Sequence, residues 1–147
     1  MRTAGDLFTL KTKGPLKIFI DGASSGNPGP AGAGIVILDA QNRLVLQEAV
    51  PLGKATNNQA EYLALLLALR HLVALGNPKA VVYTDSELLY NQLTGRYRVR
   101  ADHLRSLHLL ARAYLQTLKV PVEWVARERN QQADRLARKA VQQQRRS

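Results

Sequence analysis

The sequence contains no cysteine, and it has only one tryptophan and one methionine among its 147 residues. Without cysteine, disulfide bridges, thiolate zinc sites and a cysteine nucleophile are all excluded. No stretch approaches the roughly 18 consecutive apolar residues of a membrane-spanning helix, and the N-terminus lacks the apolar core of a signal peptide. We therefore expect a soluble, cytoplasmic protein with no membrane partner.

Acidic residues are also scarce, because 11 Asp and Glu stand against 21 Lys and Arg, for a formal net charge of +10. An excess of positive charge on this scale favours a polyanionic partner, of which nucleic acid is the simplest. Solubility is an equally good explanation, so charge alone does not decide between the two. The length predicts one domain, with a core that needs no covalent cross-links.

The hydrophobic pattern predicts a mixed α/β fold with helices on the faces of the sheet. The expected domain spans residues 16–141, between a loose N-terminal extension (1–15) and a polar basic tail (142–147). Short connections predict that the first three strands form an antiparallel meander. We expect Trp124, in the fifth strand, to lie in the core. The expected strands are residues 16–21, 31–38, 43–50, 80–85 and 120–125, and the expected helices are residues 57–75, 87–93, 101–118 and the segment from about 130 onward.

Four acids stand at the ends of these elements. Asp21 and Asp85 end predicted strands, whereas Glu61 and Asp134 lie in the expected first turns of helices. Open α/β sheets gather ligands at strand C-termini and helix N-termini, and four carboxylates meeting there would repel one another unless cations intervened. Carboxylate oxygens without thiolates or clustered histidines select hard ions such as Mg²⁺ or Mn²⁺. A pair of such ions about 3.5–4 Å apart can activate water for phosphodiester cleavage.

Each acid also has a purely structural explanation. An Asp-Gly step such as Asp21-Gly22 is more often a turn than a site. Glu61 can pair with the helix dipole, and Asp85 and Asp134 can cap helices. The hypothesis of a metal site therefore rests on the whole set and on the residues around each member.

Four segments, IDGASSGNPGPAGAG, TNNQAEYLAL, YTDS and NQQADRLA, together resemble the type 1 ribonuclease H family, over about residues 16–141. The resemblance implies the ribonuclease H fold, a five-stranded mixed sheet in the order 3-2-1-4-5 with strand two antiparallel and helices on both faces. It implies that Asp21, Glu61, Asp85 and Asp134 are the catalytic acids and hold two Mg²⁺ ions, or Mn²⁺ in their place, when substrate is bound. The implied activity is endonucleolytic cleavage of the RNA strand of an RNA/DNA hybrid, leaving 5′-phosphate and 3′-hydroxyl ends.

The same resemblance implies a set of substrate contacts. The backbone of residues 22–24 is expected to approach the RNA, and the amides of residues 57–59 to contact 2′-hydroxyls and base edges across the minor groove. Capping of the following helix is the structural alternative for residues 56–59. The implied contacts are Gly22, Ala23, Ser24, Asn57, Asn58 and Gln59 for the RNA, and Asn27 and Thr56 for a phosphate of the DNA strand. Independently of the resemblance, Arg127 or Arg129, in the loop before the last acid, is a candidate for contact with the scissile phosphate.

The chain departs from the family pattern at two places. The loop 126–133 lacks the histidine that many members carry before the last acid, and the three histidines, His71, His103 and His108, fall in predicted helices. The segment 96–103 replaces the basic, Trp-containing protrusion of many bacterial relatives, so the arginines between positions 96 and 105 are candidates for gripping the substrate. We expect a slower or differently tuned enzyme, and a monomer.

Two alternatives to a metal-dependent ribonuclease H remain open. One is a non-catalytic module of the same fold that binds RNA/DNA hybrids or double-stranded RNA. The other is a nuclease of that fold that acts on double-stranded RNA. The missing loop histidine motivates the first alternative, although a pure binder would gain affinity by losing acids near phosphates.

Overall fold

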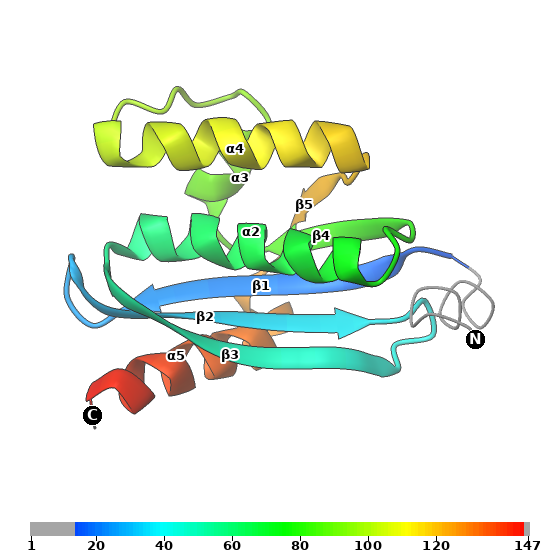
Figure 1. Cartoon of the computed structure of the whole chain (residues 1–147), viewed down its shortest axis with the longest axis horizontal. Coiled ribbons are helices and arrows are strands. Elements are labelled where there is room, and N and C mark those ends of the chain that lie inside the picture. Colours follow the sequence, from blue (N-terminus) through cyan, green and yellow to red (C-terminus); the bar gives the residue numbers. More distant parts are fainter. Residues whose placement is uncertain (1–13, 146–147) are drawn as a thin grey trace.

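The protein folds as a five-stranded mixed sheet with helices on both faces, in a computed structural model that describes residues 14–145 (Figure 1). Most of the predicted N-terminal extension, residues 1–13, lies outside this range. The strands are β1 (Leu16–Ser24), β2 (Gly29–Leu38), β3 (Leu44–Ala55), β4 (Ala80–Thr84) and β5 (Val122–Trp124). The helices are α2 (Asn57–Ala74), α3 (Glu87–Leu93), α4 (Asp102–Leu118) and α5 (Gln131–Arg145), with a short 3₁₀ turn, η1 (Arg127–Arg129), before α5.

The strand order is β3-β2-β1-β4-β5, as predicted. Strand β2 is antiparallel to both of its neighbours, whereas β4 is parallel to β1 and to β5. Because β1 and β4 run side by side in the same direction, their C-terminal ends meet at one edge of the sheet. This edge is where the first and third predicted acids stand.

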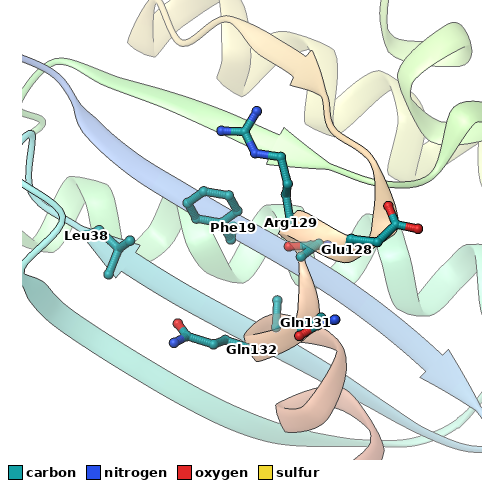
Figure 2. Close-up of a pocket in the computed structure, with 8 residues that line it drawn as sticks. Phe19, Leu38, Glu128, Arg129, Gln131 and Gln132 are labelled. Atoms are coloured by element: carbon teal, nitrogen blue, oxygen red, sulfur yellow. The ribbon is translucent and has the colours of Figure 1, made fainter.

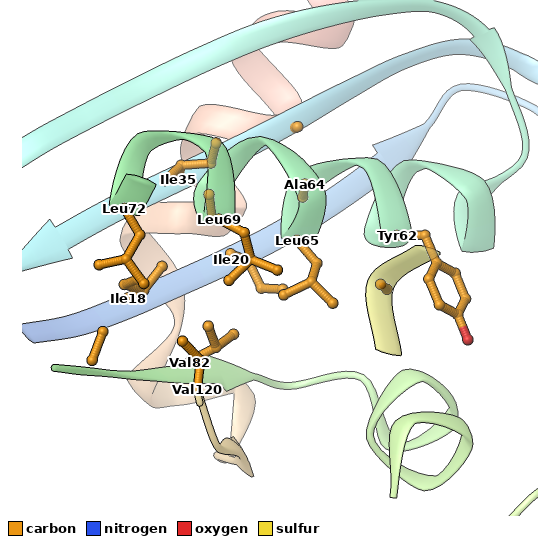
Figure 3. Close-up of a cluster of buried hydrophobic side chains, with 14 of the residues drawn as sticks. Ile18, Ile20, Ile35, Tyr62, Ala64, Leu65, Leu69, Leu72, Val82 and Val120 are labelled. Atoms are coloured by element: carbon orange, nitrogen blue, oxygen red, sulfur yellow. The ribbon is translucent and has the colours of Figure 1, made fainter. Parts of the chain in front are cut away.

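The main core lies between the sheet and α2, which crosses one face and carries α4 on its outer side (Figure 1). Ile18 and Ile20 of β1 and Val82 of β4 pack with Leu65 and Leu72 of α2, and all five are at most 1% exposed (Figure 3). Each fully buried aliphatic side chain of this kind contributes about 1.5–3 kcal/mol. This layer anchors β1, β4 and α2, the elements that carry three of the four acids.

Helix α5 covers the opposite face of the sheet through small side chains (Figure 1). Its Ala133 and Ala137 are 0% exposed, and they pack against Gly32 and Gly34 of β2. A Cβ atom at Gly34 would overlap the backbone of Ala133, and one at Gly32 would lie 2.5 Å from the carbonyl oxygen of Ala137. The helix backbone therefore rests directly on the strand, and this contact fixes the start of α5.

The structure differs from the predicted elements in ways that have physical reasons. Strand β3 continues to Ala55 rather than ending near residue 50, because a bulge in its pairing with β2 absorbs an extra residue. Trp124 is 44% exposed, so its expected place in the core was wrong: β5 is a three-residue edge strand. The indole Nε1 donates instead to the backbone oxygen of Asp85 at 3.2 Å.

The last helix is longer than expected. Residues 142–145 of the predicted tail belong to α5, and Gln144 ties this end to the sheet by donating to the oxygen of Ala31 and accepting from the nitrogen of Gly53. No helix within residues 14–145 is long and apolar enough to cross a membrane.

Candidate active site

The four predicted acids line a single cavity of about 470 Å³ at the edge where β1 and β4 end. Asp21 lies in β1 and Asp85 directly follows β4, while Glu61 comes from α2 and Asp134 from the first turn of α5. The two helices approach from opposite faces of the sheet (Figure 1). We expected Glu61 in the first turn of α2, but it is the fifth residue of the helix and lies just beyond that turn. We call this space the acid cavity.

The close approach of β1 to α2 depends on Gly22, the neighbour of Asp21. A Cβ atom at this position would overlap the backbone of Ala60 and Glu61. Gly22 is buried by the contact, which brings Asp21 and Glu61 into the same cavity. The need for glycine here therefore comes from packing against the helix, a role that the sequence alone did not reveal.

Each carboxylate of the acid cavity has a donor from the protein. The backbone nitrogen of Gly22 donates to Asp21, and side chains of α2, the η1–α5 junction and α5 serve the other three. The contacts are Gly22 N to Asp21 Oδ1 at 3.0 Å, Asn57 Nδ2 to Glu61 Oε1 at 3.2 Å, Asn130 Nδ2 to Asp85 Oδ2 at 3.1 Å, and Arg138 Nη2 to Asp134 Oδ2 at 2.9 Å. Across residues 14–145, no group of three or more Asp, Glu, His or Cys side chains is arranged so that it could hold a metal ion.

Burial and mutual repulsion make two of these carboxyl groups hard to ionise. Burial, followed by the charge of Asp85, raises the pKa of Asp21 from 3.8 to about 8. Burial likewise raises the pKa of Glu61 from 4.5 to about 7, although a hydrogen bond with Ser86 acts in the lowering direction. Without a cation, the cavity therefore disfavours the ionised form of both carboxyl groups. An all-oxygen donor set in this state fits a hard divalent cation, which would relieve the repulsion.

Four of the six predicted RNA-contact residues line the acid cavity, and Asn58 and Gln59 do not. Ala23, Ser24 and Asn57 line the cavity with Gly22. Asn58 is half-buried in the first turn of α2.

The expected capping alternative is confirmed for the start of α2. Gln59 N donates to Thr56 Oγ1 at 3.1 Å, and Thr56 N donates to Gln59 Oε1 at 2.8 Å, which makes a capping box. Asn27 Oδ1 accepts from the backbone nitrogen of Asn57 at 2.9 Å. These three side chains therefore order the edge of the acid cavity and satisfy N–H groups that the helix itself leaves without partners.

The two predicted arginines lie in different places. Arg127 lines the acid cavity, and its charge acts to lower the pKa of Glu61. Arg129 instead lines another cavity, beside Phe19 (Figure 2). Residues two positions apart in a 3₁₀ turn project about 240° apart, so they do not face the same site. Of the two, only Arg127 is placed for the expected contact with a phosphate at the acids.

Two residues of the site were missed by sequence reasoning. Asn130 is 1% exposed, and its Nδ2 donates both to the oxygen of Ile20 at 2.8 Å and to Asp85. We had interpreted Asn130 only as the beginning of a helix, and nothing in the sequence separates a cap from a ligand holder. Arg138 pairs with Asp134, and the four-residue spacing of the two in the last helix is a signal from which this pair could have been predicted.

The three histidines lie outside the acid cavity, within the part of the chain that the structure describes. His71 Nε2 pairs with Glu48 Oε2 at 2.8 Å, and His108 Nδ1 lies 3.1 Å from the hydroxyl of Tyr62. His103 is exposed at the start of α4. All three therefore contribute to packing or to the surface, and none of them adjoins the four acids.

Comparison with known proteins identifies the family. The family model described as "Reverse transcriptase-like" matches residues 19–140. A bifunctional protein of Mycobacterium tuberculosis is 45% identical over 123 residues, which cover 82% of this chain and 34% of that protein. The chain thus spans about one third of the length of this relative. Ribonuclease HI of Halobacterium salinarum is 37% identical over 132 residues, which cover 87% of this chain and 65% of the relative.

Solved structures agree with the sequence relatives. The crystal structure of RNase H1 from Halobacterium salinarum superposes with a TM-score of 0.84 at 37% identity, and the match covers 88% of this chain and 99% of that one. LC11-RNase H1, solved in complex with an RNA/DNA hybrid, superposes with a TM-score of 0.82 at 32% identity, over 87% of this chain and 97% of that one. The strand order, the edge at which the acids meet and these relatives agree, and the chain belongs to the ribonuclease H-like family.

Proposed function

We propose that the chain is a ribonuclease H: an endonuclease that hydrolyses the RNA strand of RNA/DNA hybrids and leaves 5′-phosphate and 3′-hydroxyl ends. The observation that carries the proposal is the meeting of Asp21, Glu61, Asp85 and Asp134 in one cavity, although they are spread over more than a hundred positions of the sequence. The positively charged chain suits a polyanionic substrate. The proposed enzyme acts as a monomer, since one chain supplies all four acids. Its proposed compartment is the cytoplasm.

Ribonuclease H enzymes in general depend on metal ions, and the four acids are the proposed ligands of two Mg²⁺ ions, or Mn²⁺ in their place. Such a pair supplies an activated water and stabilises the leaving oxygen. The chain's own contribution is the preorganisation of the carboxylates. Gly22 N, Asn130 and Arg138 orient three of them before any cation arrives. Because Asp21 and Glu61 have raised pKa values, cation binding would release protons from them.

The substrate would lie across the rim of the acid cavity. The backbone of residues 22–24 and the amides of Asn57, Asn58 and Gln59 are the proposed contacts to the RNA strand, since 2′-hydroxyls distinguish RNA from DNA at a site. Asn27 and Thr56 are the proposed contacts to a phosphate of the DNA strand. Asn57 lines the cavity, its side chain donates to Glu61, and its backbone nitrogen donates to Asn27. These contacts support a direct connection between the residues proposed to bind the substrate and the acids.

A second basic surface supports the proposed grip on a duplex. Arg96, Arg98, Arg105 and Arg112 line a cavity of about 590 Å³ between α3 and α4, together with the 53% exposed Tyr97. Three of these arginines, Arg96, Arg98 and Arg105, belong to the segment that we expected to hold the substrate in the absence of a basic protrusion. If about 4–6 phosphates are neutralised, the log–log slope of affinity against salt should be near −4 to −5.

Cleavage of labelled substrates tests the proposal. An RNA/DNA hybrid, double-stranded RNA, double-stranded DNA and single-stranded RNA are each incubated with Mg²⁺, with Mn²⁺ or with EDTA. We expect cleavage of the hybrid alone, in either metal, and its loss in the Asp21→Asn and Asp85→Asn variants. Cleavage that survives in either folded variant would contradict the proposal.

A non-catalytic module remains the second candidate, because no histidine within residues 14–145 lines the acid cavity. It predicts tight hybrid binding without cleavage in either metal. A nuclease specific for double-stranded RNA would instead cut that duplex in preference to the hybrid. The same assay therefore separates the three functions.

A further inference from the structure

His108 is a titratable side chain of the cavity between α3 and α4, which we call the basic cavity. It lines this space of about 590 Å³ together with Arg96, Arg98, Arg105 and Arg112. Arg105 and Arg112 stand three positions before and four positions after His108, so the three share one face of α4. None of the described residues that line the cavity is an acid. The cavity therefore offers N–H donors and positive charge, the features by which proteins hold phosphate groups.

A chain of buried hydrogen bonds fixes the ring of His108. Tyr62 is 1% exposed, and its hydroxyl donates to Gln92 Oε1 at 2.7 Å and lies 3.1 Å from His108 Nδ1. The rings of Tyr62 and His108 meet edge to face, at 85° and with centroids 6.1 Å apart. Because the hydroxyl has a single proton and Gln92 Oε1 accepts it, Nδ1 of His108 is the donor in the contact with Tyr62. In the neutral ring, Nε2 is then the nitrogen without a proton.

The second ring nitrogen of His108 is accessible from the basic cavity. Nε2 points away from Tyr62, and it forms no hydrogen bond within residues 14–145. It is not fully enclosed, because Asn130 Oδ1 is the buried side-chain atom without a partner in that range. Protonation of Nε2 therefore adds a charge and a donor to the cavity and leaves the contact with Tyr62 intact.

Without an anion, the surroundings of His108 disfavour this protonation. Burial, followed by the charge of Arg112, lowers the pKa of His108 below its ordinary value of 6.5. The other polar side chains around the ring are two neutral groups and three further arginines, one of which pairs with an exposed acid. They are Tyr62 of α2, Gln92 of α3, Arg96 and Arg98 of the segment after α3, and Arg105 of α4 with Asp102 at 3.0 Å. A phosphate group among these arginines would reverse the local charge and favour the imidazolium form.

We propose that the basic cavity binds a phosphate group, with protonated His108 as a ligand beside Arg105 and Arg112. The phosphate can belong to the backbone of a nucleic acid or to a free phosphate compound. With the first source, the inference rests on the proposed grip on a duplex and makes that grip dependent on pH. The factor that protonation of His108 adds to the affinity for phosphate is also the factor that bound phosphate adds to the affinity for the proton.

NMR of the full chain with isotopically labelled histidine rings tests the ligand directly. The ring resonances of His71 and His108 are followed from pH 8 to pH 5 in EDTA, with an RNA/DNA hybrid, with inorganic pyrophosphate or with neither. We expect a bound phosphate to raise the pKa of His108, whereas His71, which pairs with Glu48 outside the cavity, should not change. A higher pKa with the hybrid assigns the site to backbone phosphates, and one with pyrophosphate alone assigns it to free phosphate compounds. No change at His108 with either probe would overturn the proposal.

Substitution of His108 provides the second test. Asparagine places an amide group where Nδ1 contacts Tyr62 but has no atom in the place of Nε2, so His108→Asn keeps the buried contact and loses the proton-dependent ligand. His103→Asn, at an exposed position of the same helix, is the matched control.

The probe that raises the pKa of His108 is then titrated into the wild type and both variants in EDTA at pH 8 and pH 5. Its affinity should rise about tenfold more on acidification in the wild type and His103→Asn than in His108→Asn, as expected for one hydrogen bond to a charged group. The residues of the acid cavity titrate in all three proteins, so the difference between them isolates His108. An equal pH dependence in all three would overturn the proposal. Neither test requires cleavage, so a failure here is distinguishable from a failure of the proposed nuclease in its own assay.

Discussion

Replacing Asp21 by asparagine should make the fold more stable when no divalent cation is present. The pKa of Asp21 is about 8 in the folded protein, against an ordinary value of 3.8. Between these values the unfolded chain releases a proton that the folded chain keeps, so stability falls as pH rises from about 4 to about 8. At about 1.4 kcal/mol for each pH unit, the upper limit of this penalty is roughly 4 kcal/mol at pH 7.

The measured gain should be smaller than this limit. Asparagine removes the charge, but it also replaces the carboxyl group whose interaction with Asp134 helps to raise the pKa of Asp21. We therefore expect the free energy of unfolding to rise by about 1–3 kcal/mol at pH 8, and by less at pH 5. For a domain of this size, the gain corresponds to an increase of roughly 3–10 °C in Tm.

Thermal and urea denaturation in EDTA between pH 5 and pH 8 measures the effect. Asp102→Asn is the matched control, because Asp102 is a surface acid, with a side chain 91% exposed, and its change should stay within about 0.5 kcal/mol. Excess Mg²⁺ should reverse the order, since a ligand at a hundred times its Kd stabilises the wild type by about 2.7 kcal/mol. A variant that is less stable than the wild type in EDTA at pH 8, or a difference that does not change with pH, would refute the reasoning.

Three further predictions concern packing, the support of Asp85 and the basic cavity. Gly34→Ala should lower the free energy of unfolding in urea by about 2–3 kcal/mol, because its methyl group overlaps α5, and an unchanged midpoint would contradict that contact. Asn130→Ala leaves Asp85 without its amide donor, and calorimetry should show weaker binding of Mg²⁺; equal affinity would mean that the hydrogen bond does not orient the carboxylate. Replacing both Arg98 and Arg112 by alanine should reduce the salt slope of hybrid binding in EDTA by about 2, and an unchanged slope would place the grip elsewhere.

The elements that could be predicted from sequence are those whose local signals agree with their packing. The antiparallel meander, α2 with its capping box and α3 were expected and are present. The end of β3 was missed because a proline and a glycine normally end a strand, and the bulge that accommodates them depends on the partner strand. Trp124 was assigned to the core from its hydrophobicity, but a short strand at the sheet edge has only one covered side.

The candidate site was predictable to the level of its acids. Asp85 directly follows β4, as predicted. Strand β1 was expected to end at Asp21 but continues to Ser24, and Asp21 instead follows Ile20, the last residue of β1 that pairs with β4. The supporting contacts were less accessible, because Asn130 reaches Ile20 across a separation of 110 residues, and only the fold defines that neighbour. Arg127 and Arg129 could not be distinguished either, since the direction of each depends on the turn that η1 makes.

The positions of the acids depend on glycine residues, which have no side chain, as much as on the side chains that pack in the core. Gly22 lets β1 touch the backbone of α2, and Gly32 and Gly34 let α5 rest on β2. These contacts bring Glu61 from one face of the sheet and Asp134 from the other to the same edge as Asp21. Burial at this edge, followed by the charge of Asp85, raises the pKa of Asp21, so the arrangement opposes folding near neutral pH, and the aliphatic core under α2 must offset that cost.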